Sequence, residues 1–246
     1  FCLKRRTCVQ SDMGHITTEA SKEAGARGIL LSRYNSITGR PTPEHTEAWK
    51  SMQRSYVRVL GPWLPPDKEA RILDAGCGEG ALLSVLRELG YINLGGLDIS
   101  AENVAICHKA GLSFVYQMDV VQLEKHDPTV TLEVILLMDV LEHIPKDQTV
   151  SLLAQVRGRL TRGGWVVIQT PNMGCVFGHY HRFNDLTHEF GLTEKTAIDL
   201  MVAAGFERVD VQVRPAWNAT TFLGRIREQY LKVLHRVVYL AEDSSR

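Results

Sequence analysis

A glycine-rich segment, GCGEG at 76–80, is the strongest chemical signal in the sequence. It follows the short apolar stretch 71–74, and a helical pattern begins at Ala81. Glycines let the backbone turn sharply and approach a ligand closely. The first turn of the following helix adds free N–H groups and the positive end of the helix dipole. This pattern predicts a small ligand bound at a strand–helix turn.

The glycine pattern alone does not identify the ligand. Gly76, Gly78 and Ala81 satisfy the dinucleotide-binding pattern G-x-G-x-x-[GA], and Asp98 follows about 20 residues later, as that pattern requires. An oxidoreductase that binds NAD(P) is therefore one alternative. Asp74 argues against it, because a carboxylate two residues before the glycines would repel a pyrophosphate. The same carboxylate suits the cationic end of an amino acid.

Two further carboxylates stand where predicted strands end. Asp98 closes the apolar stretch 94–98, where its oxygens can accept hydrogen bonds from ribose hydroxyls. Asp119 follows the stretch 113–118, where it can hold an adenine amino group. Aspartate is also common in turns at strand ends, so a structural role for either residue stays an alternative.

Short apolar stretches alternate with helical patterns from residue 70 onward. We expect strands at 71–74, 94–98, 113–118, 132–138, 165–170 and 208–213, and helices at 81–89, 101–110, 149–160 and 194–204. This alternation predicts an α/β fold with a doubly wound, mostly parallel sheet and helices on both faces. The carboxyl ends of parallel strands share one edge, so the sheet would bring the glycine-rich segment and the carboxylates together.

In order and spacing, these motifs resemble those of the class I S-adenosylmethionine-dependent methyltransferases, which have a Rossmann-like fold. The resemblance covers about residues 70–213 and rests on ILDAGCGEGALLSVLRELGY, GLDIS, QMDV, VILLMDVLEHIP, GGWVVIQTPN and AAGFERV. It implies S-adenosylmethionine as the cofactor. The implied contacts are Asp74, Gly76 and Gly78 to the methionine part, Asp98 to the ribose, Ile99, Asp119 and Val120 to the adenine, and Met138 and Asp139 on the pocket wall. Cys77, in the same loop, is counted with these cofactor-binding residues, as a small filling residue of the loop and not as a nucleophile.

Methyl transfer from a sulfonium is an in-line displacement, so the protein must align the acceptor and exclude water. A base also helps when the acceptor is a hydroxyl. We predict His143, after the fourth strand, and His188, after the fifth, as catalytic residues, with a packing role as the alternative for His143. Asp139, Glu142 and His143 resemble in spacing the divalent-ion site of some ubiquinone-pathway O-methyltransferases, but we predict that no metal is bound.

The segment 171–192 is long, polar and aromatic, and we expect a loop without secondary structure that lines the acceptor site. Its sequence resembles that of methyltransferases of bacterial surface-sugar and glycan biosynthesis. That resemblance implies O-methylation of a small hydroxyl-bearing acceptor, such as a sugar or glycan precursor. A solvated loop is the alternative for the segment, and a non-catalytic module that binds S-adenosylmethionine is the alternative for the whole chain.

Composition restricts the partners. The 28 basic residues balance the 28 acidic ones, which argues against a nucleic-acid partner. The five cysteines are scattered without a CxxC pair, which suits the reducing cytoplasm. No apolar run approaches the roughly 20 residues that a membrane span needs.

We expect one domain with additions at both ends: a tail and capping helices at 1–66, the S-adenosylmethionine-binding domain at 67–215 and an amphipathic helix at 216–246. The capping residues are expected to be Tyr34, Asn35, Arg40, Trp49 and Arg54, with Trp49 in the core. The last helix, apolar on one face and basic elsewhere, is expected to contact an anionic membrane or to dock on protein. Six strands are predicted where the family has seven, so we expect that the last strand is missing by truncation and that Met13 is the initiator or the chain a fragment.

Overall fold

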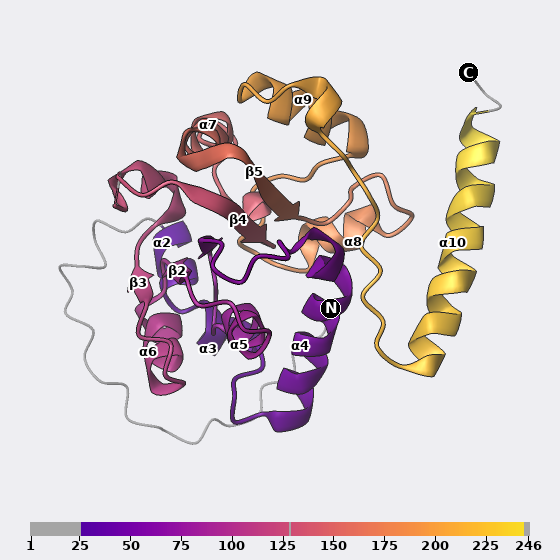
Figure 1. The fold of residues 1–246 in the computed structure, drawn as a ribbon. Helices are drawn as coiled ribbons and strands as arrows, with labels where there is room; N and C mark the ends of the chain where they lie inside the picture. Colours follow the sequence, from indigo (N-terminus) through magenta and orange to yellow (C-terminus); the bar gives the residue numbers. More distant parts are fainter. Residues whose placement is uncertain (1–25, 128, 244–246) are drawn as a thin grey trace.

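The computed structural model describes residues 26–127 and 129–243, and at its centre lies a sheet of five parallel strands (Figure 1). The strands are β1 (Ile72–Ala75), β2 (Leu94–Asp98), β3 (Val115–Gln117), β4 (Leu132–Met138) and β5 (Leu160–Gln169). Their order is β3-β2-β1-β4-β5, so the direction of winding reverses between β1 and β4. Doubly wound sheets bind ligands at such a switch point. The expectations for 1–25, including Met13, lie outside the described residues.

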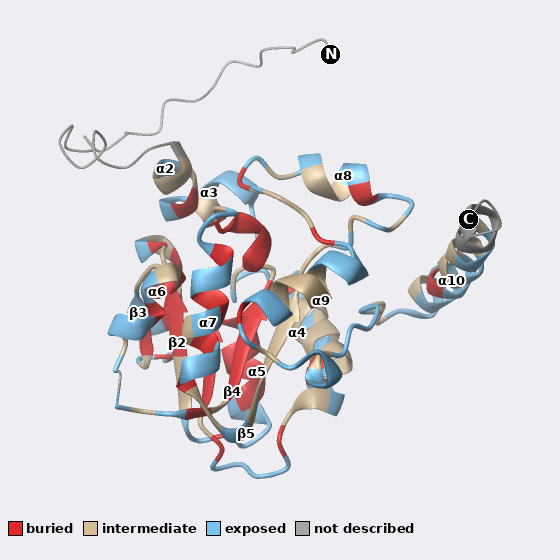
Figure 2. Cartoon of the chain, turned by 90° about the horizontal axis from the view of Figure 1, so that it is seen from above, coloured by how far each residue is buried: buried red, intermediate tan, exposed pale blue. Residues whose placement is uncertain are grey.

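Helices cover both faces of the sheet, as Figure 2 shows by the buried strands between them. Side chains of β4 alternate between the faces, because successive residues of a strand point in opposite directions. Val134, Leu136 and Met138 pack with α4 (Thr46–Leu60) and α5 (Ala81–Glu88). Ile135 and Leu137 pack with α7 (Thr149–Arg159) and α9 (Glu194–Ala203). This arrangement confirms the predicted doubly wound α/β fold.

Shorter elements complete the fold. They are α2 (Ala26–Ser32), α3 (Tyr34–Thr38), α6 (Ala101–Lys109) and α8 (Gly178–Phe183), with the 3-10 turns η1 (Gly61–Trp63), η2 (Val120–Lys125), η3 (Leu141–His143) and η4 (Arg208–Asp210). Side-chain hydrogen bonds cap the N-termini of two helices, α6 and α9. The hydroxyl of Ser100 accepts a hydrogen bond from the Asn103 amide and caps α6, while Thr193 and Thr196 form a capping box on α9.

Two predicted features of the chain differ from the structure. The segment 208–213, predicted as a strand, forms η4 and then an extended stretch, and Val209 is 88% exposed. The chain instead follows α4, where Ser55 Oγ donates to the Asn218 carbonyl at 2.9 Å. The segment 171–192, predicted as an irregular loop, contains α8. Among the described residues, β5 is therefore the edge strand of the sheet on this side. The sixth strand, which the sequence predicted, is not formed there, and neither is a seventh.

The last helix described is α10 (Phe222–Asp243), which stands beside the domain (Figure 1). An ion pair of 2.7 Å between Arg58 of α4 and Glu228 attaches the helix to the body. Glu228 Oε1 also accepts a hydrogen bond from the Ala219 amide. Within the described part of the chain, no helix has both the length and the apolar character needed to cross a membrane.

Candidate functional site

A cavity opens at the carboxyl edge of the sheet, next to the switch point between β1 and β4. Its volume is about 90 Å³. Eight of the ten residues predicted to bind the cofactor lie on its wall: Gly76, Gly78, Asp98, Ile99, Asp119, Val120, Met138 and Asp139. The parallel strands thus bring these residues together from four separate stretches of sequence.

Asp74 and Cys77 are the two predicted cofactor residues that do not line the cavity. The side chain of Cys77 packs in a core with Leu83 and Cys107, which agrees with its interpretation as a filling residue. A hydrogen bond with Cys107, together with burial, raises the pKa of the Cys77 thiol, so the thiol stays neutral. Asp74 lies on β1 and is 1% exposed.

The glycine-rich loop turns because its glycines adopt left-handed backbone conformations. Gly76 has a φ of 89° and Gly80 a φ of 80°, a region that side chains disfavour. A Cβ at Gly76 would also overlap the side chain of Val140. Asp98 fixes the loop, because its Oδ2 accepts a hydrogen bond from the Gly78 amide at 2.8 Å. The loop is therefore tied to the end of β2, on the floor of the cavity.

The Asp98 carboxylate keeps one hydrogen-bond acceptor position free for a ligand. Its Oδ1 accepts hydrogen bonds from the Ser100 amide at 2.9 Å and from Asn103 Nδ2 at 3.1 Å. With the bond to Gly78, the carboxylate uses three of its roughly four acceptor positions. One position is left for a hydroxyl, consistent with the predicted contact to a ribose.

Asp74 is a buried carboxyl group with an unsatisfied atom. Its Oδ1 has no hydrogen-bond partner among the described residues. Burial, reinforced by the charge of Asp98, raises the pKa of Asp74 to about 7. An unpaired buried carboxylate is costly, and a nearby cation would offset that cost. The residues present therefore fit a ligand that has a cationic group near the glycine-rich loop.

Asp119 has both a structural contact and an ion pair. Its Oδ1 accepts a hydrogen bond from the Val121 amide at 3.2 Å and so caps η2. Its Oδ2 lies 3.7 Å from Arg27 Nη1 of α2. Arg27 Nε also donates to the His143 carbonyl at 3.1 Å, so α2 lies over this end of the cavity.

Asp139 stands at the end of β4 with a strained backbone. Its φ of 55° is left-handed, which is uncommon outside glycine and often marks a functional site. Gln169 Nε2 donates to both carboxylate oxygens at 3.1 Å and holds the side chain. Burial raises the pKa of Asp139.

A second cavity adjoins the first and extends under the segment 171–192. The two cavities share Tyr34, Arg40, Asp139 and His143 on their walls. Polar side chains form most of the remaining wall of the second: Thr38, Glu142, His181, Asn184, Asp185, Thr187 and His188. The two predicted bases therefore face the space beside the cofactor cavity. Of the expected capping residues, Tyr34 and Arg40 lie on these walls, and Trp49 is in the core.

A chain of hydrogen bonds orients His143. Tyr34 Oη donates to Asp185 Oδ2 at 2.7 Å, and Thr187 Oγ1 donates to Asp185 Oδ1 at 2.6 Å. Because the single hydroxyl proton of Thr187 is used in that bond, Thr187 accepts from His143 Nδ1 at 2.7 Å. The Nδ1–H tautomer leaves Nε2 of His143 with its lone pair.

His188 also has Nε2 with a free lone pair, because its Nδ1 is held by a backbone carbonyl. Its Nδ1 lies 2.8 Å from the His181 carbonyl, which can only accept, so Nδ1 carries the proton. The rings of His188 and His143 have centroids 4.8 Å apart. Burial, reinforced by the charge of His188, lowers the pKa of His143 to about 4. His143 is therefore neutral near pH 7 and able to accept a proton.

Glu142 completes a group that could hold a metal ion. Glu142, His143 and His188 bring ligand atoms within 4.8 Å of one another. Burial, with the charge of Asp139, raises the pKa of Glu142 to about 8, and its Oε2 has no hydrogen-bond partner among the described residues. Imidazole and carboxylate ligands suit a transition-metal ion such as Zn²⁺. The group can thus either move protons or hold an ion.

Sequence reasoning missed Thr187 as a partner of His143. The two residues are 44 positions apart, and only the path of the segment 171–192 brings them together. The pattern Asp185-Leu-Thr187 signals the local turn between Asp185 and Thr187, because a carboxylate two residues before a hydroxyl often forms such a turn, but it does not signal the contact with His143.

Comparisons with known proteins relate this chain to methyltransferases. Residues 44–211 match the model of a family described as a methyltransferase domain. The ubiquinone biosynthesis O-methyltransferase of Paramagnetospirillum magneticum is 30% identical over 170 residues, 65% of this chain and 66% of that protein. The protein of the same name from Methylocella silvestris is 33% identical over 106 residues, 39% of this chain and 40% of that protein. The chain thus matches less than two thirds of the length of each of these relatives.

Solved structures show the same architecture. A SAM-dependent methyltransferase from Archaeoglobus fulgidus has a TM-score of 0.57 at 20% identity, covering 76% of this chain and 88% of that chain. An S-adenosylmethionine-dependent methyltransferase from Mesorhizobium loti has a TM-score of 0.57 at 19% identity, covering 74% of this chain and 93% of that chain. At these identities the likeness concerns the fold, and it confirms the predicted Rossmann-like architecture.

Proposed function

Because this chain belongs to the methyltransferase domain family, we propose that it transfers the methyl group of S-adenosylmethionine to a hydroxyl group of a small acceptor. One observation carries this proposal: an acid-lined cavity at the glycine-rich loop meets a second, polar cavity at a wall that contains His143. When bound, S-adenosylmethionine supplies an electrophilic methyl group on its sulfonium. Family membership, with Asp74 and Asp119 in place, disfavours the NAD(P)-binding alternative.

The residues of the chain have separate tasks in this proposal. Asp98 accepts a ribose hydroxyl, and Ile99 and Val120 contact the adenine. His143 takes the proton of the acceptor hydroxyl on Nε2, the atom that the bond to Thr187 leaves free. The residues of α2 and α3 cover the cavity and exclude water, which strengthens every charge interaction inside it.

The polar wall of the second cavity supports an acceptor rich in hydroxyl groups, such as a sugar or glycan precursor. Histidine, asparagine, aspartate and threonine side chains on that wall can donate and accept hydrogen bonds. The curated relatives act in ubiquinone biosynthesis, so a phenolic acceptor is the competing candidate. Acceptor panels that contain both classes would distinguish them by kcat/KM.

The binding part of the proposal is tested by calorimetry with S-adenosylmethionine and its demethylated product, with NADH as the control. We expect both adenosyl compounds to bind and NADH not to bind. Binding of NADH alone would instead support the oxidoreductase. Binding of the cofactor without turnover of any acceptor would support the non-catalytic module.

His143 is tested by the variant H143A. We expect kcat to fall by about 100-fold or more, the usual contribution of a general base, while the dissociation constant of S-adenosylmethionine stays unchanged. The control is H108A, because His108 is an exposed histidine on α6 that lines neither cavity. An unchanged kcat would remove His143 from the reaction. Activity that a chelator abolishes and a divalent ion restores would assign Glu142, His143 and His188 to a metal.

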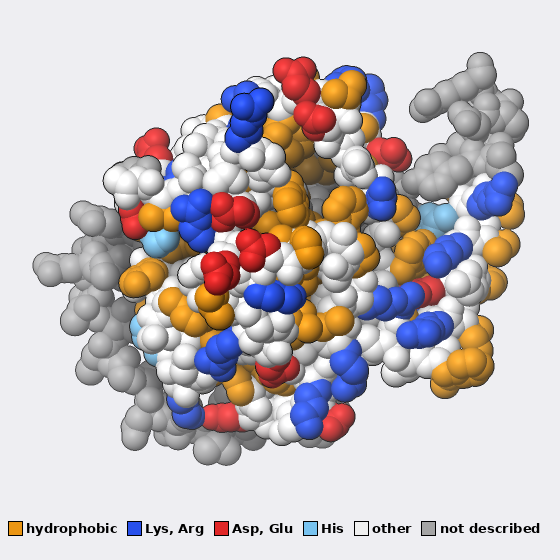
Figure 3. Space-filling model, viewed as in Figure 1, with side chains coloured by type: hydrophobic (Ala, Val, Ile, Leu, Met, Phe, Trp, Pro, Cys, Tyr) orange, Lys and Arg blue, Asp and Glu red, His pale blue; other side chains and the backbone are white. Residues whose placement is uncertain are grey.

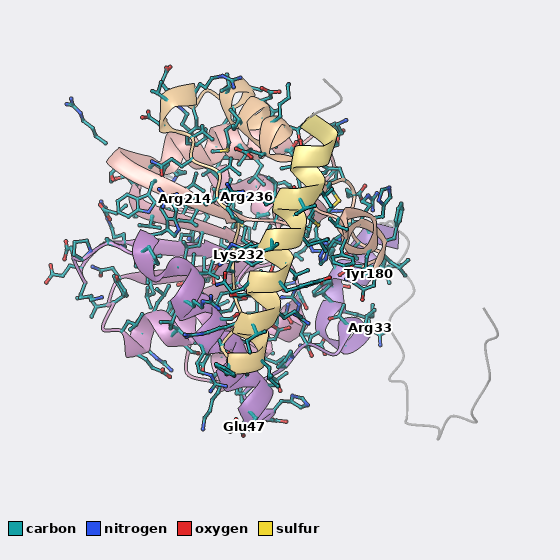
Figure 4. All side chains as sticks on the ribbon, turned by 90° about the vertical axis from the view of Figure 1, so that its right-hand side faces the viewer. Arg33, Glu47, Tyr180, Arg214, Lys232 and Arg236 are labelled. Atoms are coloured by element: carbon teal, nitrogen blue, oxygen red, sulfur yellow. The ribbon has the colours of Figure 1, made fainter. Side chains whose placement is uncertain are left out.

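We also propose that α10 contacts an anionic membrane surface from one side. Its outer face carries Phe222, Leu223, Ile226, Tyr230, Val233 and Val237, each more than half exposed. Figure 3 shows hydrophobic side chains along the outer edge of this helix, beside basic ones. Figure 4 shows Lys232 and Arg236 on one side of the helix. A helix with an apolar stripe and basic flanks suits a lipid interface.

The compartment that we propose is the cytoplasm. Cys77, Cys107 and Cys175, the cysteines within the described residues, are free thiols. Free thiols persist in a reducing compartment.

A further inference from the structure

Arg40 is a cation on the wall between the two cavities, and among the described residues it forms no direct ion pair with the acidic side chains nearby. Within residues 26–127 and 129–243, its guanidinium makes no ion pair or hydrogen bond. Its direct contact is with the ring of Tyr34, whose centroid lies 5.4 Å from Cζ. Guanidinium groups in protein interiors are normally paired, so an unpaired one at a cavity indicates a ligand that supplies the partner.

The position of Arg40 differs from that of Arg27, the other cation of the cofactor cavity. Arg27 lies near Asp119, at the end predicted to hold the adenine. The Arg40 carbonyl accepts a hydrogen bond from Asn35 Nδ2 at 3.3 Å. Asn35 of α3 donates to Glu79 Oε1 at 2.7 Å, which ties this part of the cap to the loop. Arg40 therefore lies at the glycine-loop end of the cavity.

The charges at this end are otherwise negative. Asp74, Glu79, Asp98 and Asp139 stand at or under the loop. They favour the ammonium and sulfonium groups of S-adenosylmethionine, but they repel its carboxylate. A zwitterionic amino-acid group can enter this surrounding only if a cation faces its carboxylate, and Arg40 is the cation on this part of the wall.

We propose that Arg40 binds the carboxylate of the methionine part of S-adenosylmethionine, an inference that rests on the proposed function. The planar guanidinium can donate two parallel hydrogen bonds to a carboxylate, and such charge-assisted pairs are among the stronger hydrogen bonds. This contact makes the cap at α3 part of the cofactor site and places Tyr34, in contact with Arg40, beside the acceptor cavity.

The test compares the binding of S-adenosylmethionine with that of decarboxylated S-adenosylmethionine by calorimetry. We expect the wild-type protein to bind the compound with the carboxylate about tenfold to 100-fold more tightly. In R40A and R40Q the two compounds should bind alike, because the partner of the carboxylate is gone. The matched control is R33A, because Arg33 is an exposed arginine of the same cap that lines neither cavity. R33A should discriminate like the wild type.

Two results would overturn the inference while leaving the proposed function intact. One is full discrimination in R40A and R40Q, which would place the carboxylate elsewhere. The other is a raised acceptor KM with unchanged cofactor discrimination, which would assign Arg40 to the acceptor. Failure of the wild-type protein to bind either compound would overturn the proposed function, and the inference with it. Thermal melting of each variant shows that it is folded, and R40Q, which keeps a polar side chain, serves if R40A does not fold.

Discussion

Asp74 is a carboxyl group whose charge depends on what lies next to it. Burial and the charge of Asp98 raise its pKa to about 7, so in the free protein it is partly protonated near neutral pH. Asp74 does not line the cavity, but the charge of a cationic ligand bound at the glycine-rich loop acts on it through the protein, favours the ionised form and lowers this pKa. Below pH 7, cofactor binding must then release a proton from Asp74, so the affinity falls as the pH falls.

The pH dependence gives the prediction for this residue. Between pH 5.5 and 7, the dissociation constant for S-adenosylmethionine should decrease with rising pH in the wild type, by up to about tenfold per pH unit. Above pH 7 Asp74 adds no further dependence. D74N cannot release the proton, so its profile should be flatter, while D147N, at an exposed position, should match the wild type. Calorimetry across this range measures both. Parallel profiles for D74N and the wild type would contradict the coupling.

At the scale of elements, the segment 171–192 acts as the wall that orients the base. Arg182 holds its turn by donating to the carbonyls of His188 at 2.6 Å and Glu189 at 2.9 Å. The Glu189 amide in turn donates to the Glu142 carbonyl at 2.7 Å, which joins the segment to η3. Hydrogen bonds from Thr187 and Tyr34 outweigh burial and lower the pKa of Asp185, so Asp185 stays ionised and accepts the Thr187 proton.

Removing the hydroxyl of Thr187 tests this arrangement. In T187V, Nδ1 of His143 loses its acceptor, and the ring is free to change tautomer and orientation. We expect kcat to fall by about tenfold, with an unchanged cofactor dissociation constant. T187S keeps the hydroxyl and should retain most of the rate. Steady-state kinetics and calorimetry on both variants measure this. A loss in T187S with an unchanged rate in T187V would mean that packing of the methyl group, and not the hydrogen bond, matters.

The elements that sequence could predict are those with local causes. The strand at 132–138 has the predicted bounds because its apolar residues, interrupted only by Glu133, are buried on both faces. The strand predicted at 208–213 does not form, because a local pattern does not provide a neighbouring strand. Its alternating valines fit a sheet edge, but a strand also needs a partner, and contacts such as Ser55 to Asn218 direct this chain along α4.

The residues of the site can likewise be separated into those that the sequence could predict and those that it could not. The glycine-rich loop and Asp98, Asp119 and Asp139 were predictable, because parallel strands deliver their carboxyl ends to one edge. The partners of His143 were not, because Thr187 reaches it through a loop path that no local pattern determines. The role of Arg40 likewise depends on which charges surround it in space.

At the scale of the whole molecule, α10 presents an apolar face that the domain does not cover. Across 222–238 the sequence has four basic residues, Arg225, Arg227, Lys232 and Arg236, and a single acidic one, Glu228, which is buried against Arg58. Pairing with a second copy would bring basic flanks together, and like charges repel. An anionic lipid surface instead attracts them while its acyl region accepts the apolar stripe.

Vesicle sedimentation tests this contact. The wild-type protein should bind phosphatidylcholine vesicles that contain phosphatidylglycerol, bind pure phosphatidylcholine much less, and lose part of its binding at high salt, because salt screens surface charge. R225E/R236E should lose most of the binding, since each basic residue near such a surface contributes about 1 kcal/mol. K125E/R162E makes the same change in net charge at exposed positions of the domain body and should bind like the wild type. Equal losses in the two double variants would indicate a response to net charge alone, and concentration-dependent dimers that R225E/R236E stabilises would assign the stripe to a second copy.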